Sequence, residues 1–238
     1  MPAWGRSKWR VLLMDLESIR ARAMACRRCG LRQRAKQVVF GEGNPHAVIM
    51  LVGEGPGAQE DELGRPFVGP AGQLLDRILA AAGLQREELY ITNVVKCRPP
   101  GNRAPDADEV QTCRPILAAQ IKIIRPRIIV CLGAVATRAL IAPGASITRL
   151  RGQWITRAGI HFLPTFHPTA LLRDAARKRP VWEDFKALRA LYQDLQVQQM
   201  TLTFEREGHR EGQTPHGECE VKLNESLSAG YGSHAGFR

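Results

Sequence analysis

Four short runs rich in apolar residues divide the chain, with polar or glycine-rich segments between them. The runs cover residues 47–52, 89–95, 128–133 and 160–165. Short apolar runs without clear alternation are typical of strands that are covered on both faces. We therefore predict four buried strands.

Apolar positions with helical spacing lie before, between and after these strands. The spacing predicts helices at residues 7–25, 70–82, 107–124, 134–141 and 181–197. Strands that alternate with helices indicate a doubly wound α/β sandwich, in which ligands bind where the strands end. We expect the functional site in the segments that follow the strands, at residues 53–61, 93–103, 133–136 and 166–173.

The C-terminal segment has a different composition from the rest of the chain. Beyond Met200, glycine, glutamate, histidine and serine become frequent and apolar periodicity disappears. We expect one folded domain at residues 1–199 and a disordered tail at 200–238. There is no apolar run of about 18 residues and no secretion signal, so we expect a cytoplasmic protein without a membrane span.

Charge is unevenly distributed over the 238 residues, which carry a formal net charge of +11. Residues 201–238 carry −2, so the first 200 residues carry +13. A charge of this sign and size favours a polyanionic partner, because lysine and arginine release counterions from phosphates. A basic surface that is merely solvated is the alternative.

Four of the six cysteines have a spacing suited to a metal centre. Cys26 and Cys29 form a C-x-x-C pair, and Cys97 and Cys113 follow much later in the chain. Disulfides are rare in the reducing cytoplasm, so a metal, catalysis or burial must explain these thiols. Four thiolates suit an iron–sulfur cluster or zinc, although zinc ribbons usually have a second tight pair.

A glycine-rich loop that begins at Gly53 and Glu54 follows the first strand. It is poorly suited to phosphate, because Pro56 lacks an amide donor and the nearby carboxylates would repel an anion. Glycines beside a carboxylate favour a neutral polar ligand and a water molecule. A simple strand-to-helix turn is the alternative.

Several residues near the strand ends have side chains suited to contacting a nucleobase or the stack around it. Phe67 could stack on a base, although a lone phenylalanine is more often a core residue. The amide of Asn93 complements N3–H and O4 of uracil, although such residues often cap turns. His167 could donate to a developing oxyanion, with a structural histidine as the alternative. The pair Leu171 and Leu172 could enter a base stack, with core leucines as the alternative.

Together these segments resemble the family 4 uracil-DNA glycosylases, the iron–sulfur branch of the uracil-DNA glycosylase superfamily. The match covers about residues 25–188 and includes the cysteine pattern. Its other motifs are Gly53-Glu54-Gly55-Pro56-Gly57, Gly64-Arg65-Pro66-Phe67-Val68-Gly69, the stretch from Thr92 to Arg103, and His167-Pro168. The resemblance implies a three-layer α/β/α sandwich with a central four-stranded parallel sheet.

The resemblance also implies an activity, a cofactor and a partner. The cofactor would be a [4Fe–4S] cluster on Cys26, Cys29, Cys97 and Cys113, and it would be structural. The substrate would be uracil in single- or double-stranded DNA, released by a monofunctional DNA repair glycosylase that leaves an abasic site. We expect the enzyme to be a monomer.

Residue roles follow from the matched motifs. Gly53, Glu54 and Gly55 would line the uracil and the attacking water, and Glu60 would exclude the thymine methyl group. Phe67 would stack on the base, Asn93 would read its edge, His167 would meet O2, and Leu171 would fill the gap in the duplex. Thr169 and Ala170 depart from the serine and aromatic residue usual after His-Pro.

The sequence disfavours two alternatives to a glycosylase. A covalent uracil-DNA trap needs a histidine in a basic loop beside the third cysteine, and residues 98–103 contain none. A non-catalytic iron–sulfur DNA-binding module would not need Glu54, Asn93 and His167 together. The hydrolytic enzyme is therefore the preferred interpretation.

Overall fold

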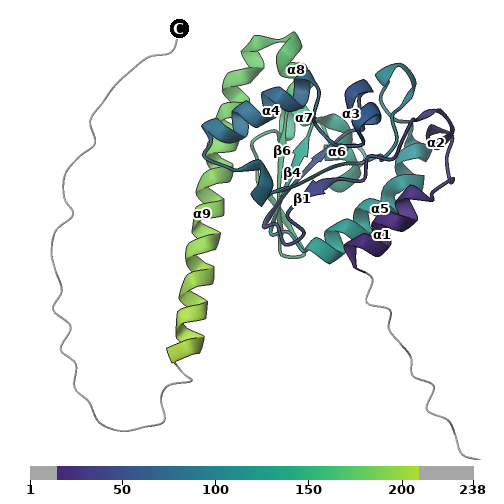
Figure 1. Cartoon of the computed structure of the whole chain (residues 1–238). Coiled ribbons are helices and arrows are strands. Elements are labelled where there is room, and N and C mark those ends of the chain that lie inside the picture. Colours follow the sequence, from purple (N-terminus) through teal and green to yellow (C-terminus); the bar gives the residue numbers. More distant parts are fainter. Residues whose placement is uncertain (1–14, 209–238) are drawn as a thin grey trace, which may run out of the picture. The chain divides into compact units, whose positions relative to one another are not determined.

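The computed structural model describes residues 15–208, with side chains described as far as residue 198 (Figure 1). The chain divides into two compact units, Met1–Gln196 and Val197–Arg238. The sheet and all predicted site residues belong to the first unit. The first part of the predicted helix at residues 7–25 and most of the predicted tail, residues 209–238, lie outside the described residues.

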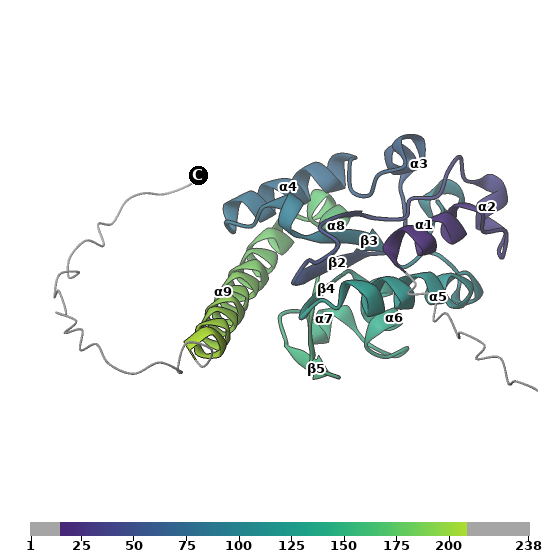
Figure 2. The same ribbon diagram turned by 60° about the horizontal axis from the view of Figure 1, so that its bottom comes forward.

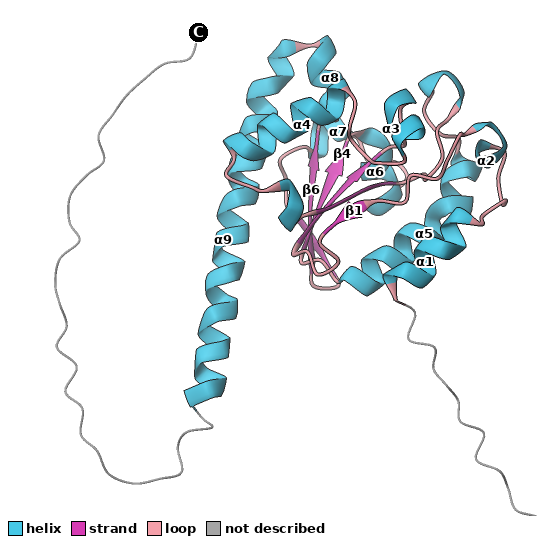
Figure 3. Ribbon diagram, viewed as in Figure 1, coloured by secondary structure: helices cyan, strands magenta, loops and turns pink. Residues whose placement is uncertain are grey.

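A single sheet of six strands forms the centre of the first unit (Figure 3). The strands are β1 (Glu42–Gly43), β2 (Ile49–Gly53), β3 (Tyr90–Asn93), β4 (Ile128–Leu132), β5 (Ile155–Arg157) and β6 (Ile160–Thr165), in the order β1-β3-β2-β4-β6-β5. Strands β3, β2, β4 and β6 pair in parallel. The edge strands β1 and β5 are antiparallel to their neighbours.

The sequence predicted four strands, and each of the four apolar runs forms one of the inner strands. The two edge strands were not predicted, because two or three residues cannot show a periodic pattern. The sheet is therefore mixed and six-stranded rather than four-stranded.

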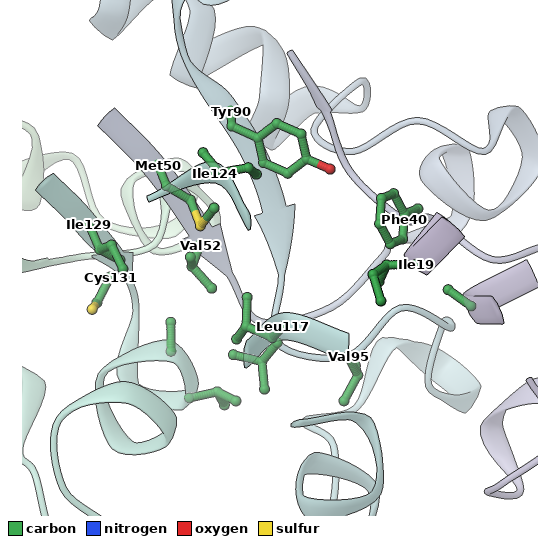
Figure 4. Close-up of a cluster of buried hydrophobic side chains, with 14 of the residues drawn as sticks. Ile19, Phe40, Met50, Val52, Tyr90, Val95, Leu117, Ile124, Ile129 and Cys131 are labelled. Atoms are coloured by element: carbon green, nitrogen blue, oxygen red, sulfur yellow. The ribbon is translucent and has the colours of Figure 1, made fainter. Parts of the chain in front are cut away.

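Alternate residues of the inner strands enter two separate hydrophobic cores, one on each face of the sheet. Met50 and Val52 of β2 belong to one core, and Ile49 and Leu51 belong to the other. Figure 4 shows the first core, in which the β2 side chains lie near Leu117. Helices on both faces thus explain why apolar residues occupy consecutive positions in the strands.

The helices cover both faces and give the three layers (Figures 1 and 2). Helices α1 (Leu16–Met24), α5 (Ala107–Ile124) and α6 (Ala134–Leu140) pack on one face. Helices α4 (Pro70–Ala81), α8 (Pro168–Arg173) and the first part of α9 (Lys178–Gly208) pack on the other. Short helices α2 (Leu31–Arg34), α3 (Ala58–Leu63) and α7 (Ile147–Leu150) lie in the connections.

Local sequence explains where helix α5 begins. Asp106 is the N-cap of α5, and its side chain accepts a hydrogen bond from the backbone amide of Glu109. The amide of Asp106 in turn donates to the Glu109 carboxylate, which completes a capping box. The predicted and observed bounds of this helix agree. Helix α9 instead continues to Gly208, beyond the predicted domain boundary at residue 199.

Among the helices within residues 15–208, none combines the length and apolar character needed to cross a bilayer.

Candidate active site

A cavity of about 690 Å³ opens beside the carboxyl ends of β2, β3 and β6, and we call it the active-site cavity. This is the sheet edge at which doubly wound folds bind ligands. Six of the predicted site residues line it: Glu54, Gly55, Glu60, Phe67, Asn93 and His167. Gly53 and Leu171 are not among the residues that line the cavity.

Gly53 lies beneath the cavity and allows two other site residues to meet. A Cβ atom at this position would lie 2.5 Å from Cζ of Phe67 and would also collide with Oδ1 of Asn93. Glycine is therefore required where the Phe67 ring and the Asn93 amide cross the end of β2. Gly53 thus allows the side chains of Phe67 and Asn93 to pack closely on the end of β2.

The Phe67 loop holds its aromatic ring in a constrained position. Phe67 has φ 52°, in the left-handed region that non-glycine residues rarely adopt, and only 5% of the residue is exposed. Gly72 packs so closely on the Phe67 backbone that a Cβ atom would overlap it. Strained backbone of this kind persists where surrounding contacts fix it, often at functional sites.

Glu60 supplies one of those contacts. Its Oε1 accepts hydrogen bonds from the amides of Val68, at 2.9 Å, and Gly69, at 2.8 Å. Gly69 is the N-cap of α4, so the carboxylate also satisfies the first donors of that helix. The sequence predicted that Glu60 excludes the thymine methyl group, whereas the structure shows Glu60 bound to the loop that carries Phe67.

Asn93 is 1% exposed, and its side-chain Oδ1 is buried without a hydrogen-bond partner. A buried unpaired acceptor costs about 1–3 kcal/mol, so native proteins rarely keep one without a function. The backbone carbonyl of Asn93 is satisfied, because Nζ of Lys96 donates to it at 2.7 Å. Within the described residues, the side chain therefore keeps an unpaired acceptor beside the active-site cavity.

The side chain of Lys96 is buried and donates hydrogen bonds to residues of β3. It is 1% exposed and also donates to Oγ1 of Thr92 at 2.6 Å. This burial excludes a contact between Lys96 and DNA phosphate. An unusual lysine within an otherwise apolar stretch was the only signal of this role in the sequence.

His167 is the N-cap of α8, and its hydrogen bonds define its tautomer. Nδ1 accepts from the amide of Thr169 at 3.2 Å and lies 2.9 Å from Oγ1 of the same residue. An accepting Nδ1 places the imidazole proton on Nε2. Thr169 thus provides a hydroxyl where the family usually has serine.

The histidine is neutral at physiological pH. Burial lowers the pKa of His167 to about 4, although the Glu60 carboxylate opposes this shift. Its ring also lies near Phe67, with 5.6 Å between ring centroids and a tilt of 32°. A neutral Nε2–H donor and an aromatic ring therefore line the same cavity.

Glu54 brings a carboxylate to this cavity. Burial raises the pKa of Glu54, while the exposed guanidinium of Arg138 lowers it. A carboxylate in such a site can orient a water molecule and stabilise nearby positive charge.

The structure distinguishes the two leucines of the predicted wedge, Leu171 and Leu172. Leu171 is 2% exposed and belongs to the hydrophobic core shared with α4 and α9. The next residue, Leu172, is 50% exposed and lines the active-site cavity beside Arg173. In the short helix α8 a step of one residue turns the side chain from the core toward solvent.

The four predicted cysteine ligands line one small second cavity, together with Arg32. Burial, together with smaller contributions from Cys113, Cys29 and Cys26, raises the pKa of Cys97 to about 12. Four mutually repelling thiolates require a cationic group between them. Within the described residues, Nε of Arg32 is buried without a partner, and its N–H can donate to a sulfur atom of a bound group.

The donor set fits an iron–sulfur cluster, because four cysteine thiolates are the usual ligands of one. The same four thiolates also suit zinc. Within the described residues, no three His, Cys, Asp or Glu side chains gather as a ready site for a single metal ion.

Comparison with known protein families shows the superfamily of the chain. A model of the uracil DNA glycosylase superfamily matches residues 40–195, which contain the active-site cavity. The chain belongs to this superfamily. It is also similar to individual members over most of its length.

Three type-4 uracil-DNA glycosylases illustrate this similarity. The Thermotoga maritima protein is 46% identical over 72% of this chain and 91% of its own. The Sulfurisphaera tokodaii protein is 45% identical over 74% and 84%, respectively. The Archaeoglobus fulgidus protein is 41% identical over 73% of this chain and 92% of its own.

Proposed function

We propose that this protein is a DNA repair glycosylase that hydrolyses the N-glycosidic bond of uracil and leaves an abasic site. The unpaired Oδ1 of Asn93, in the same cavity as the Nε2–H donor of His167, carries this proposal. The superfamily match and the type-4 relatives support it.

Asn93 would select uracil through both edges of its amide. Oδ1 accepts from N3–H of uracil, and Nδ2 donates to O4. Cytosine presents an acceptor at N3 and a donor at N4, so both contacts become repulsive. Phe67 would hold the base by stacking, in the position fixed by Glu60.

Cleavage would be driven by stabilising the two charges that develop when the bond breaks. The electron pair of the glycosidic bond leaves with uracil, and Nε2–H of His167 donates to O2 of that anion. Glu54 orients a water molecule toward C1′ of the sugar and opposes its positive charge. The water adds a hydroxyl to C1′, and its proton finally neutralises the uracil anion.

Uracil must leave the base stack before it reaches this cavity, at a cost of a few kcal/mol. We assign the gap-filling role to Leu172, because Leu171 is buried and Leu172 is half exposed at the cavity. Arg173 and Arg103 also line the cavity and can bind phosphates on either side of the extruded nucleotide.

Cys26, Cys29, Cys97 and Cys113 would hold a [4Fe–4S] cluster. When bound, the cluster supplies a structural cross-link and no chemical step. Cys26 and Cys29 follow α1, Cys97 follows β3, and Cys113 lies in α5. The cluster would therefore connect these helices to β3, the strand that ends at Asn93. We place the glycosylase domain at residues 1–199 and propose that it acts as a monomer, because one chain supplies every residue described here.

An excision assay tests the proposal. Protein is incubated with duplexes that contain U·G, U·A or T·G and with uracil in single strands, and abasic sites are cut by alkali and resolved on denaturing gels. We expect cleavage of the uracil substrates and none of T·G. Binding without cleavage supports a non-catalytic DNA-binding module, and a heat-stable adduct supports a covalent trap.

A further inference from the structure

A buried ionic network lies behind the segment that carries His167, on the side facing α9. Asp184 of α9 is 2% exposed and forms an ion pair with Arg151. The same carboxylate accepts a hydrogen bond of 2.6 Å from Oγ1 of Thr165. We call these three residues the Asp184 network.

The surrounding backbone accommodates this carboxylate closely. Gly152 has φ 76°, and a Cβ atom there would lie 2.7 Å from Oδ1 of Asp184. Arg151 also donates to the backbone carbonyl of Pro180 at 2.8 Å, so it binds α9 at two points. Burying a charged pair costs desolvation energy that apolar residues of similar size would avoid. Such a pair therefore calls for a role beyond stability.

The network is connected to His167 through two consecutive residues. Thr165 is the last residue of β6, two positions before His167. Phe166 lies between them, and its ring centroid is 6.0 Å from Cζ of Arg151 and 5.0 Å from Cζ of Arg177. Cations at these distances attract an aromatic ring. Thr165 and Phe166 are thus both held from the α9 side.

His167 itself is fixed from the opposite direction by α8. Thr169 of α8 holds Nδ1, as described above. On the other side, the amide of Gly133 donates to the Thr165 carbonyl at 2.8 Å. The position of the imidazole therefore depends on the backbone at the end of β6.

We propose that the Asp184 network is a positioning device that sets Nε2 of His167 for the departing uracil. This rests on the role of His167 in the proposed function. Thr165 is the direct link, because its hydroxyl joins the carboxylate to the strand end. Misplacement of a catalytic group by about 1 Å can cost on the order of 100-fold in rate. Loss of one anchor among several should cost about tenfold.

If the Asp184 network positions His167, variants of Thr165 should differ in kcat. Thr165→Val removes the hydroxyl and keeps the shape, and it should lower kcat for uracil excision about tenfold with little change in KM. Thr165→Ser keeps the hydroxyl and should stay within threefold of the wild type. With 5-fluorouracil, whose anion needs less stabilisation, the loss in Thr165→Val should shrink to about twofold.

A double-mutant cycle separates positioning from general stability. Each Thr165 variant is measured with and without His167→Ala, under single-turnover conditions on the full chain. Thr165→Val should cost nothing further once His167 is absent. Asp184→Asn should behave in the same way and replaces Thr165→Val if that variant does not fold. Val181→Ala on α9 is the matched control, and it should lower Tm while kcat stays within twofold.

The outcomes distinguish this inference from the proposed function. If His167→Ala excises uracil as fast as the wild type, the role assigned to His167 is wrong. If His167→Ala is impaired but Thr165→Val costs the same factor in both backgrounds, the positioning role alone is wrong. A Thr165→Ser variant as slow as Thr165→Val would also overturn it.

Discussion

Replacement of Asn93 by leucine should make the protein more stable and less active. In the free protein the Oδ1 atom is buried without a partner, and the substitution removes that atom while it keeps most of the side-chain volume. An unpaired buried polar atom costs about 1–3 kcal/mol, so we expect a gain of about 1 kcal/mol after repacking. For a domain of this size, that gain raises Tm by about 2–4 °C.

The same substitution leaves two polar groups of the bound uracil without partners. At about 1.5 kcal/mol each, the loss is about 3 kcal/mol, which corresponds to roughly a 100-fold fall in kcat/KM. The assay measures single-turnover excision from a U·G duplex beside thermal unfolding of the same preparation.

Gln120→Met provides the matched control for Asn93→Leu. Gln120 is also fully buried, but its amide donates to the Phe40 carbonyl at 2.9 Å and to the Tyr90 hydroxyl at 3.2 Å. Loss of a satisfied amide should lower Tm and affect excision only slightly. If Asn93→Leu lowers Tm and excises uracil within threefold of the wild type, the unpaired acceptor has no role in recognition.

Three further predictions follow from burial and charge. The pKa of His167 is about 4 in the folded protein and near 6.5 in the unfolded protein. Its imidazole should therefore destabilise the fold as pH falls from about 6.5 to 4. In urea unfolding measured at a series of pH values, His167→Ala should weaken the pH dependence of stability in that range. A flat series in the wild type would contradict the assigned burial. Leu172→Ala should slow uracil excision from duplex DNA about tenfold and leave the rate on single strands unchanged. Leu171→Ala should instead lower Tm by several degrees. The reverse pattern would make Leu171 the gap-filling residue. An iron–sulfur cluster should colour the protein brown; Cys97→Ser should abolish this colour and reduce the iron content, while Cys131→Ser in β4 should keep both. Equal iron in the two variants would exclude Cys97 as a ligand.

The sequence predicted the central strands and the place of the cavity because both depend on local patterns. A buried strand needs an apolar run, and the ends of such strands meet at one sheet edge. The bounds of α5 were predicted because its capping residues are adjacent in sequence. Asn93 and His167 converge for the same reason, since each follows or ends a strand of the sheet.

The features that were missed depend on contacts between distant segments. The choice between Leu171 and Leu172 depends on the rotation of a six-residue helix, which no periodic pattern can fix. Asp184 is an ordinary charged position on an amphipathic helix until Thr165 and Arg151 approach it from other elements. The bonds from Glu60 to the Phe67 loop are likewise invisible in sequence.

The most direct test of the central claim is the amount of free base released from DNA that contains uracil, thymine or cytosine at one position. The wild-type protein should release uracil in one equivalent per site and leave an abasic strand, with no release of thymine or cytosine. His167→Ala and Asn93→Leu should each release uracil far more slowly. Undetectable uracil from the iron-loaded wild-type protein, or equal rates in the two variants and the wild type, would contradict the account.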